Sequence, residues 1–217
     1  HDGMRRMIEN RESVYYYITA MNENYVHPPM PEGVEEGIKR GIYRFREAGI
    51  ESGHKVRLLG GGTILREVIA AAEMLEKDWN IGAEVYSITS FNELARDGLD
   101  VERWNMLHPN DEPRLPYISQ VLPQGEGPVI SSTDYMKSYS DQVREYVHDT
   151  FVALGTDGFG RSDTREKLRE FFEVDRNYVT VAALYALQND GALDAVTVAK
   201  AVQQYGIDPD KPNPATV

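Results

Sequence analysis

Four short strand-like runs, separated by helix-like segments, constrain the fold more than any other feature of this chain. The runs are rich in β-branched and apolar residues and lie at residues 55–59, 84–89, 129–132 and 150–154. Strands that are joined through single helices pair in parallel, and the helices then cover both faces of the sheet. The alternation therefore predicts an α/β domain with three layers and a mostly parallel sheet.

Helical spacing and capping residues mark the segments between the strands. Apolar residues recur at helical spacing over 64–75, where Thr63 is placed to cap the helix, and Ser90 with Glu93 forms a capping box for the next helix. Residues 100–116 are polar and contain prolines, so we expect irregular structure there. The other helical segments are predicted at residues 117–122, 135–147, 164–172, 177–190 and 195–205.

The first 33 residues have a different character. Residues 13–19 include Tyr15, Tyr16 and Tyr17 without polar alternation, which predicts a strand buried on both faces with its tyrosines packed in a sheet. Three prolines between His27 and Gly33 exclude a regular helix or an interior strand and indicate a linker.

We therefore expect three parts. Residues 1–26 end one α/β domain whose remainder is missing, residues 27–50 form a linker and lead-in, and residues 51–217 form the three-layer domain. The chain starts without an initiator Met and without an apolar leader, which suggests a segment of a longer chain.

Charge and composition exclude several classes of function. The net charge of −12 disfavours binding to the phosphate backbone of nucleic acids. No apolar run approaches the ~20 residues that span a bilayer. The sequence has no cysteine, which excludes disulfides, thiolate metal sites and cysteine nucleophiles, and fits a reducing cytoplasm.

Two glycine-containing turns are candidates for ligand binding. Gly60, Gly61 and Gly62 follow the first predicted strand of the domain, where backbone amides and a helix N-terminus can hold an anion. The turn matches neither the phosphate-binding P-loop nor the dinucleotide pattern. We favour a structural role, in which the glycines let the helix approach the strand closely.

The second candidate is the loop 155–163, which follows the last predicted strand. Loops at the carboxyl ends of parallel strands often carry function, so Asp157, Arg161 and Asp163 are candidate ligand-binding residues. The same three side chains can instead form a local ion network, and Ser162 or Asp163 suits the N-cap of the next helix. Turn chemistry explains most of these residues, and we favour the structural interpretation.

The histidines give no support for a metal site. His1, His27, His54, His108 and His148 include no pair at helical i, i+4 spacing. We interpret His108 as a hydrogen-bonded structural residue.

The run at residues 22–25 is a weaker candidate. Asn22, Glu23, Asn24 and Tyr25 follow the predicted N-terminal strand. They can face a cleft, although a solvated loop has the same composition.

Seven longer strings are too irregular to arise from packing alone. They are VYYYIT at 14–19, NENY at 22–25, PMPEG at 29–33, TSFNELARDG at 89–98, ERWN at 102–105, STDYMK at 132–137 and LGTDGFGRSD at 154–163. Together they resemble, nearly end to end, the C-terminal portion of the homodimeric bacterial pyruvate dehydrogenase subunits. These belong to the transketolase-like thiamine diphosphate enzymes.

This resemblance implies a part of an oxidoreductase. Such subunits decarboxylate pyruvate on thiamine diphosphate, with magnesium, and transfer the acetyl group to lipoyl groups of the dihydrolipoyl acetyltransferase core. It also implies that residues 1–26 end the pyrimidine-binding middle domain and that residues 51–217 are the C-terminal domain. The implied partners are the rest of the subunit, a second copy in a homodimer and the acetyltransferase core of a cytoplasmic multienzyme complex of pyruvate metabolism and glycolysis. Nucleic acid and membrane are not among them.

The same resemblance assigns no catalytic, cofactor-binding or metal residue to this chain. The family's diphosphate and magnesium motif, Gly-Asp-Gly followed by Asn, has no match, because Asp157-Gly158 lacks the preceding Gly and a suitable Asn. The activating carboxylate and the active-site histidines come from segments before His1. We therefore expect a scaffold and subunit interface that is inactive alone and binds no cofactor. The alternative is a free-standing α/β module that binds a small anion at one of the two turns.

Overall fold

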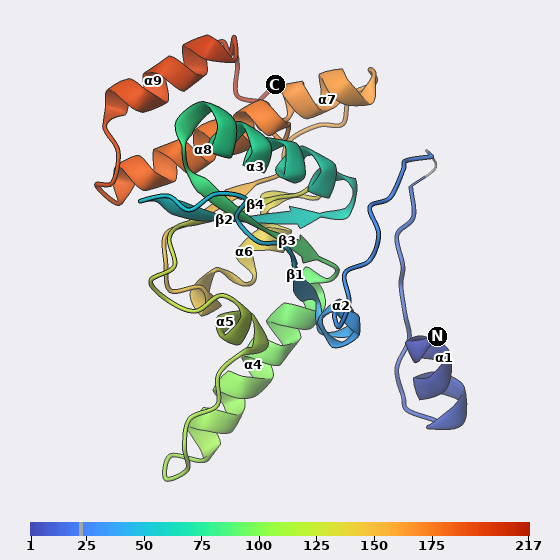
Figure 1. Cartoon of the computed structure of the whole chain (residues 1–217). Helices are drawn as coiled ribbons and strands as arrows, with labels where there is room; N and C mark the ends of the chain where they lie inside the picture. The colour runs from blue at the N-terminus through green and yellow to red at the C-terminus, as the bar shows by residue number, and fades with distance from the viewer. Residues whose placement is uncertain (22–23) are drawn as a thin grey trace.

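The computed structural model describes residues 1–21 and 24–217, and its centre is a five-stranded sheet (Figure 1). The strands are β1 Ile42–Arg46, β2 Lys55–Gly61, β3 Gly82–Ile88, β4 Val129–Ser132 and β5 Phe151–Leu154. Their spatial order is β1-β3-β2-β4-β5, with β1 antiparallel to β3 and the other neighbours parallel. The predicted α/β class and mostly parallel sheet are confirmed.

Helices cover both faces of the sheet, as Figure 1 shows. One layer contains α3 Leu65–Trp79, preceded by the 3₁₀ turn η2 Gly62–Ile64, with α7 Arg165–Phe171, α8 Arg176–Asn189 and α9 Ala195–Gln204. The opposite layer contains α4 Phe91–Leu107, α5 Tyr117–Val121, α6 Lys137–Asp141 and the 3₁₀ turn η3 Arg144–Tyr146.

The strand β2 separates two apolar cores. Its side chains alternate between the faces, so Leu58 packs in the core under α3 and α8 while Leu59 packs in the core beside α4 and α5. All of β2 except Lys55 is buried. A strand that is buried on both faces reads as a continuous apolar run, which explains why the sequence pattern located it.

The lead-in to the domain contains two elements that the sequence pattern did not predict. The short helix α2 Glu35–Arg40 ends at Gly41, which has a left-handed backbone, and β1 follows directly. Both lie within residues 27–50, the segment predicted as linker and lead-in. Arg44 and Arg46 break the apolar pattern of β1, as is common on an edge strand.

Residues 13–19 do not form the predicted buried strand, and that prediction is wrong for this chain. No described segment pairs with them as a neighbouring strand, and Tyr15 and Tyr17 are exposed. Tyr16 instead folds back on the N-terminal turns α1 Asp2–Met4 and η1 Arg5–Glu9, where its hydroxyl donates to Asp2 Oδ2 at 2.6 Å. A strand needs a neighbour for its backbone donors, and the described chain supplies none.

Two predicted segments have different boundaries. The helix α4 continues to Leu107, so residues 100–107 are not irregular; they contain no proline, and Pro109 comes just after the helix. The helix predicted over 135–147 divides into α6 and η3. The Ser140 hydroxyl donates to Ser131 Oγ at 2.6 Å, and Val143, between the two elements, is buried in the core.

Capping residues were predicted with mixed success. The Ser90 hydroxyl accepts a hydrogen bond from the Glu93 amide, which confirms the N-cap of α4. Thr63 does not cap α3, because a 3₁₀ turn precedes the helix and its hydroxyl has no partner in the described chain. Thr164 caps α7, in place of the predicted Ser162 or Asp163.

None of the described helices is long and apolar enough to cross a membrane.

Candidate functional site

The chain reverses direction across the sheet between β2 and β4. After β2 it moves outward to β3, and after β3 it crosses back to β4 and β5 on the other side. In open α/β sheets, ligands bind at the carboxyl ends of the strands where such a reversal occurs. The residues here are the glycine turn at the end of β2 (Gly60, Gly61 and Gly62) and Thr133 and Asp134 after β4.

The glycine turn has a structural explanation. A Cβ atom on Gly60 would lie 2.6 Å from Leu65 Cα, so only glycine lets the first turn of α3 approach the strand. Gly62 has a φ of 57°, a left-handed conformation that starts the 3₁₀ turn. These contacts support the role that the sequence pattern favoured, which is close packing of helix on strand.

Polar groups at this reversal do not suit an anion. The Asp134 carboxylate oxygen Oδ1 lies 3.7 Å from the position of a Cβ on Gly62, at the start of the helical turns. Burial raises the pKa of Asp134, because a desolvated carboxylate is costly to ionise. A second anion would meet this carboxyl group. Two buried hydroxyls lie close to the glycine turn: Thr63 follows Gly62 in the sequence, and Ser132 is opposite Gly60 in the register of β2 and β4. Neither hydroxyl has a hydrogen-bond partner in the described chain.

An ion cluster ties three helices together beside this edge. Glu67 of α3 is buried and accepts from Arg176 Nε at 2.9 Å and from Arg169 Nη1 at 3.2 Å. Burial opposes its ionisation, but the hydrogen bond and charge of Arg176 outweigh that cost and hold the pKa of Glu67 below its usual range. Arg169 also reaches the Tyr25 hydroxyl at 3.3 Å, and Arg66 lies over the Tyr25 ring.

The loop 155–163 is held by backbone contacts. Asp157 Oδ1 accepts a hydrogen bond from the Lys137 amide at 3.2 Å, and Gly158 has a φ of 92° against Pro214. The predicted ion network does not form within the described chain: Arg161 lies over the Phe171 ring at 4.7 Å, and Asp163 accepts from the Thr164 amide. These contacts support the structural interpretation of the loop.

A pocket of about 310 Å³ lies between this loop and α7. Its lining residues are Gly160, Arg161, Ser162, Asp163, Lys167, Leu168 and Phe171. Lys167 pairs with Glu170 at 2.6 Å, the Arg161 guanidinium lies over the Phe171 ring, and Asp163 adds a carboxylate to the lining. The pocket therefore offers little for holding an anion.

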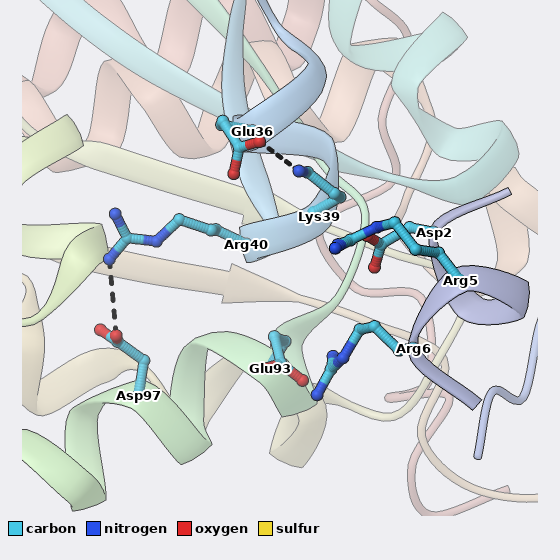
Figure 2. A pocket seen from close by; sticks show the side chains of 8 residues that line it. All are labelled: Asp2, Arg5, Arg6, Glu36, Lys39, Arg40, Glu93 and Asp97. Carbon is cyan, nitrogen blue, oxygen red and sulfur yellow. Dashed lines mark hydrogen bonds and ion pairs between the residues drawn. The ribbon is translucent and has the colours of Figure 1, made fainter. Parts of the chain in front are cut away.

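A second pocket, of about 240 Å³, lies between the N-terminal turns and the domain (Figure 2). Figure 2 shows Asp2, Arg5 and Arg6 facing α2 and the start of α4. The domain side supplies Glu36, Lys39, Arg40, Glu93 and Asp97. Four acidic and four basic side chains line the pocket, so its formal charge balances.

Ion pairs within each side account for much of this charge. Arg40 reaches Asp97 at 3.5 Å, Lys39 pairs with Glu36, and Arg5 reaches Asp2 at 2.7 Å. Hydrogen bonds from Tyr16 and Arg5 lower the pKa of Asp2 to about 2. The pocket is a polar junction between two parts of the chain, and no sequence pattern predicts that these parts lie side by side.

The histidines lie on the surface and apart from any carboxylate cluster. All five are exposed, and His108 Nδ1 lies 2.8 Å from Trp104 O, which confirms the predicted hydrogen bond of His108. Among residues 1–21 and 24–217, no group of three or more potential ligands could hold a metal ion. Of the run at 22–25, Asn22 and Glu23 lie outside the described residues.

Glu67 and its two arginines were missed by the sequence analysis, although one signal was available. A lone glutamate interrupts the apolar side of α3, next to Val68 and three residues after Ile64. A charged residue in that position is buried only when it is paired. The arginines that pair with it are more than 100 residues away, so no local pattern identifies them.

The fold defines the class of protein, and comparison with known families agrees. The family model described as "Transketolase-like TK C-terminal domain" matches residues 41–175, which include all five strands. The chain therefore belongs to the transketolase-like C-terminal domain family.

Comparison with individual proteins gives a more specific similarity than the family model does. The chain is 55% identical over its whole length to the pyruvate dehydrogenase E1 component of Cupriavidus necator, and 57% identical over 99% of its length to that of Escherichia coli. The resemblance found in the sequence strings is thus confirmed. The chain spans 24% of each of these relatives. Among solved structures, a transketolase from Leishmania mexicana is similar over 71% of this chain and 19% of its own, with 20% identity and a TM-score of 0.48.

Proposed function

We propose that this chain is the C-terminal part of a pyruvate dehydrogenase E1 subunit that uses thiamine diphosphate and magnesium to decarboxylate pyruvate. The observation that carries the proposal is identity of 55–57% with E1 components over essentially the whole chain, together with coverage of only 24% of their length. The acetyl group would pass to lipoyl groups of the acetyltransferase core, in the cytoplasm.

Within that subunit the chain would serve as scaffold and interface. Residues 1–26 would complete a preceding pyrimidine-binding domain, residues 27–50 would lead in to the C-terminal domain, and residues 51–217 would make up that domain. The exposed Tyr15, Tyr17 and Ile18 support the first assignment, because apolar side chains and unpaired backbone on an extended segment invite a partner sheet.

The described residues do not fit a diphosphate and its magnesium ion. Magnesium prefers carboxylate ligands together with phosphate oxygens, and no suitable group of acidic residues gathers in the described chain. At the strand ends, Asp134 already places a carboxyl group beside the glycine turn. The catalytic and cofactor-binding residues would therefore lie in the remainder of the subunit.

Activity of the full-length subunit tests this proposal. The subunit from the native gene should decarboxylate pyruvate with a lipoyl acceptor, whereas residues 1–217 alone should be inactive. Calorimetric titration of residues 1–217 with thiamine diphosphate and magnesium should give no saturable heat. A saturable response at micromolar affinity would contradict the assignment of the cofactor site to other segments.

Association is a further part of the proposal. In the full subunit, apolar surface of residues 1–217 would help to join two copies in a homodimer. The isolated chain should self-associate through residues 13–19. Sedimentation of the chain with and without residues 1–26 at tens of micromolar tests this, because interfaces of micromolar affinity are populated in that range. A monomer in both forms would contradict it.

A further inference from the structure

The helix α4 has two unlike halves. Its buried residues are Phe91, Leu94, Ala95 and Gly98, and all of them lie in the first half. From Leu99 to Leu107 no residue is buried, although the helix continues without a break. Figure 1 shows α4 extending away from the sheet and the chain doubling back along it toward α5. We call residues 99–116 the α4 arm.

Specific contacts hold the arm in shape. Asn105 Nδ2 donates to the Arg114 carbonyl at 3.0 Å, and the Arg114 amide donates to Asn105 Oδ1 at 2.8 Å. The Trp104 ring is stacked on His108 at 4.4 Å, and the Arg114 guanidinium lies over Trp104 at 3.8 Å. At the base, the Tyr117 amide donates to Asp97 Oδ2 at 2.6 Å. The segment that returns along α4 is thus bonded to the helix at two places, Asn105 and Asp97.

The arm nevertheless exposes apolar side chains. Met106 is 71% exposed, and Leu99, Leu107 and Leu115 are exposed as well. Leu99 and Met106 are seven residues apart, about two helical turns, so they lie on one side of the helix. Exposed apolar side chains that gather on one side of an ordered, projecting element are typical of a surface that docks on a partner.

The N-terminal turns indicate where that partner lies. Asp2, Arg5 and Arg6 line the pocket that Glu93 and Asp97 of α4 also line, so the start of the chain lies beside the first two turns of this helix, at the base of the arm (Figure 2). The E1 relatives are about four times as long as the chain. Under the proposed function, the additional polypeptide joins at residue 1, next to α4, at a high effective concentration.

We propose that the α4 arm docks on the part of the same subunit that precedes residue 1. This inference rests on the proposed function. The apolar side of Leu99 and Met106 packs on that part of the subunit and fixes the orientation of the C-terminal domain. The stack of Trp104, His108 and Arg114 keeps the arm rigid before it docks, which lowers the entropy lost on docking.

Site-specific cross-linking in the full-length subunit tests this. A photo-reactive phenylalanine analogue replaces Met106, and the matched control replaces Tyr185, which is exposed on α8 in the opposite layer. We expect the residue 106 probe to give a cross-link within one subunit, to a peptide that precedes residue 1, at a yield well above the control. A cross-link between two isotopically distinct copies, or a yield no higher than the control, would overturn the proposal.

Hydrogen exchange gives a second readout that does not depend on a substituted residue. Amides of residues 99–107 should exchange at least about tenfold more slowly in the full-length subunit than in residues 1–217, while those of α9 should be similar in both. Equal exchange of the arm in the two proteins would contradict docking. Pyruvate decarboxylation is measured separately, so an active subunit without arm protection refutes the docking alone, and an inactive subunit with arm protection refutes the proposed function alone.

Discussion

The N-terminal 33 residues and the sheet domain use the same residue types with opposite results. Tyr17 and Ile18 are 88% and 81% exposed, whereas Tyr86 and Ile88 of β3 are 3% and 5% exposed. Both pairs belong to runs with strong β-propensity. β3 has a neighbouring strand on each side, while residues 13–19 have no neighbouring strand in the described chain. Strand propensity therefore becomes burial only when another strand supplies the ladder.

The two regions also use arginine differently. Arg57 of β2 is 1% exposed and donates to Asp149 Oδ2 at 2.6 Å and to the carbonyls of Pro123 and Gly127. Arg6 pairs with Glu12 at 2.7 Å on the surface of the N-terminal segment. A buried guanidinium with fixed partners ties strands and loops together, and an exposed pair contributes little.

The largest expected difference comes from these two arginines. Arg57→Ala removes the guanidinium that bonds two carbonyls and the Asp149 carboxylate, which keeps only the Gly125 amide as a donor. We expect a loss of about 3–5 kcal/mol in the free energy of unfolding. The matched variant Arg6→Ala should change it by less than about 0.5 kcal/mol. Urea unfolding followed by circular dichroism measures both. Similar losses would mean that the N-terminal segment folds cooperatively with the sheet.

A core substitution tests the difference between the sheet domain and the N-terminal segment through apolar packing. Leu58→Ala removes a fully buried side chain between β2 and α3 and should cost about 2–5 kcal/mol. Ile18→Ala removes an exposed side chain and should be within about 0.5 kcal/mol of the parent. The thermal midpoints of the two variants, scanned side by side, test this. A large effect of Ile18→Ala would show that residues 13–19 are buried in solution.

Carboxylates in the sheet domain and in the N-terminal segment should differ in how much they contribute to the pH dependence of unfolding. The pKa of Glu67 is lowered in the folded state, so its stabilising contribution is present above its ordinary pKa of 4.5 and is lost as pH falls toward the lowered value. Glu67→Gln should cost about 1–3 kcal/mol at neutral pH and progressively less below pH 4.5. Glu12→Gln is the control in the N-terminal segment. Hydrogen bonds from Asn10 and Arg6 lower the pKa of Glu12 as well, but this carboxylate is exposed, so its replacement should change the pH dependence of unfolding much less than Glu67→Gln does. Parallel pH profiles for Glu67→Gln and the parent would contradict the assignment.

The smallest expected effect concerns helix capping. Ser90→Ala removes the acceptor for the Glu93 amide at the start of α4 and should cost about 1 kcal/mol. Ser13→Ala, in the exposed N-terminal segment, should have no measurable effect. Denaturant midpoints from repeated titrations resolve a difference of this size. A neutral Ser90→Ala would indicate that tertiary contacts alone hold the first turn of α4.

Local signals in the sequence were enough to predict the sheet domain. The parallel strands β2 to β5 followed from short apolar runs between helical segments, and the cap at Ser90 followed from the residue three positions later. These signals concern residues that are close in sequence, or strands whose burial on both faces leaves a continuous apolar run. The resemblance to pyruvate dehydrogenase subunits also came from the sequence, because seven irregular strings cannot be explained by packing.

Tertiary structure alone decided the features that depend on distant partners. In the antiparallel edge strand β1, Arg44 and Arg46 interrupt the apolar run, yet the strand pairs with β3 in the sheet. The pairing of Glu67 with Arg169 and Arg176 joins residues more than 100 positions apart, and the pocket in Figure 2 joins the N-terminal turns to α4. Residues 13–19 have every local property of a buried strand and remain exposed. The physical reason is the same throughout: propensity is local, but a backbone ladder, a buried charge and an apolar face each need a partner that only the folded chain provides.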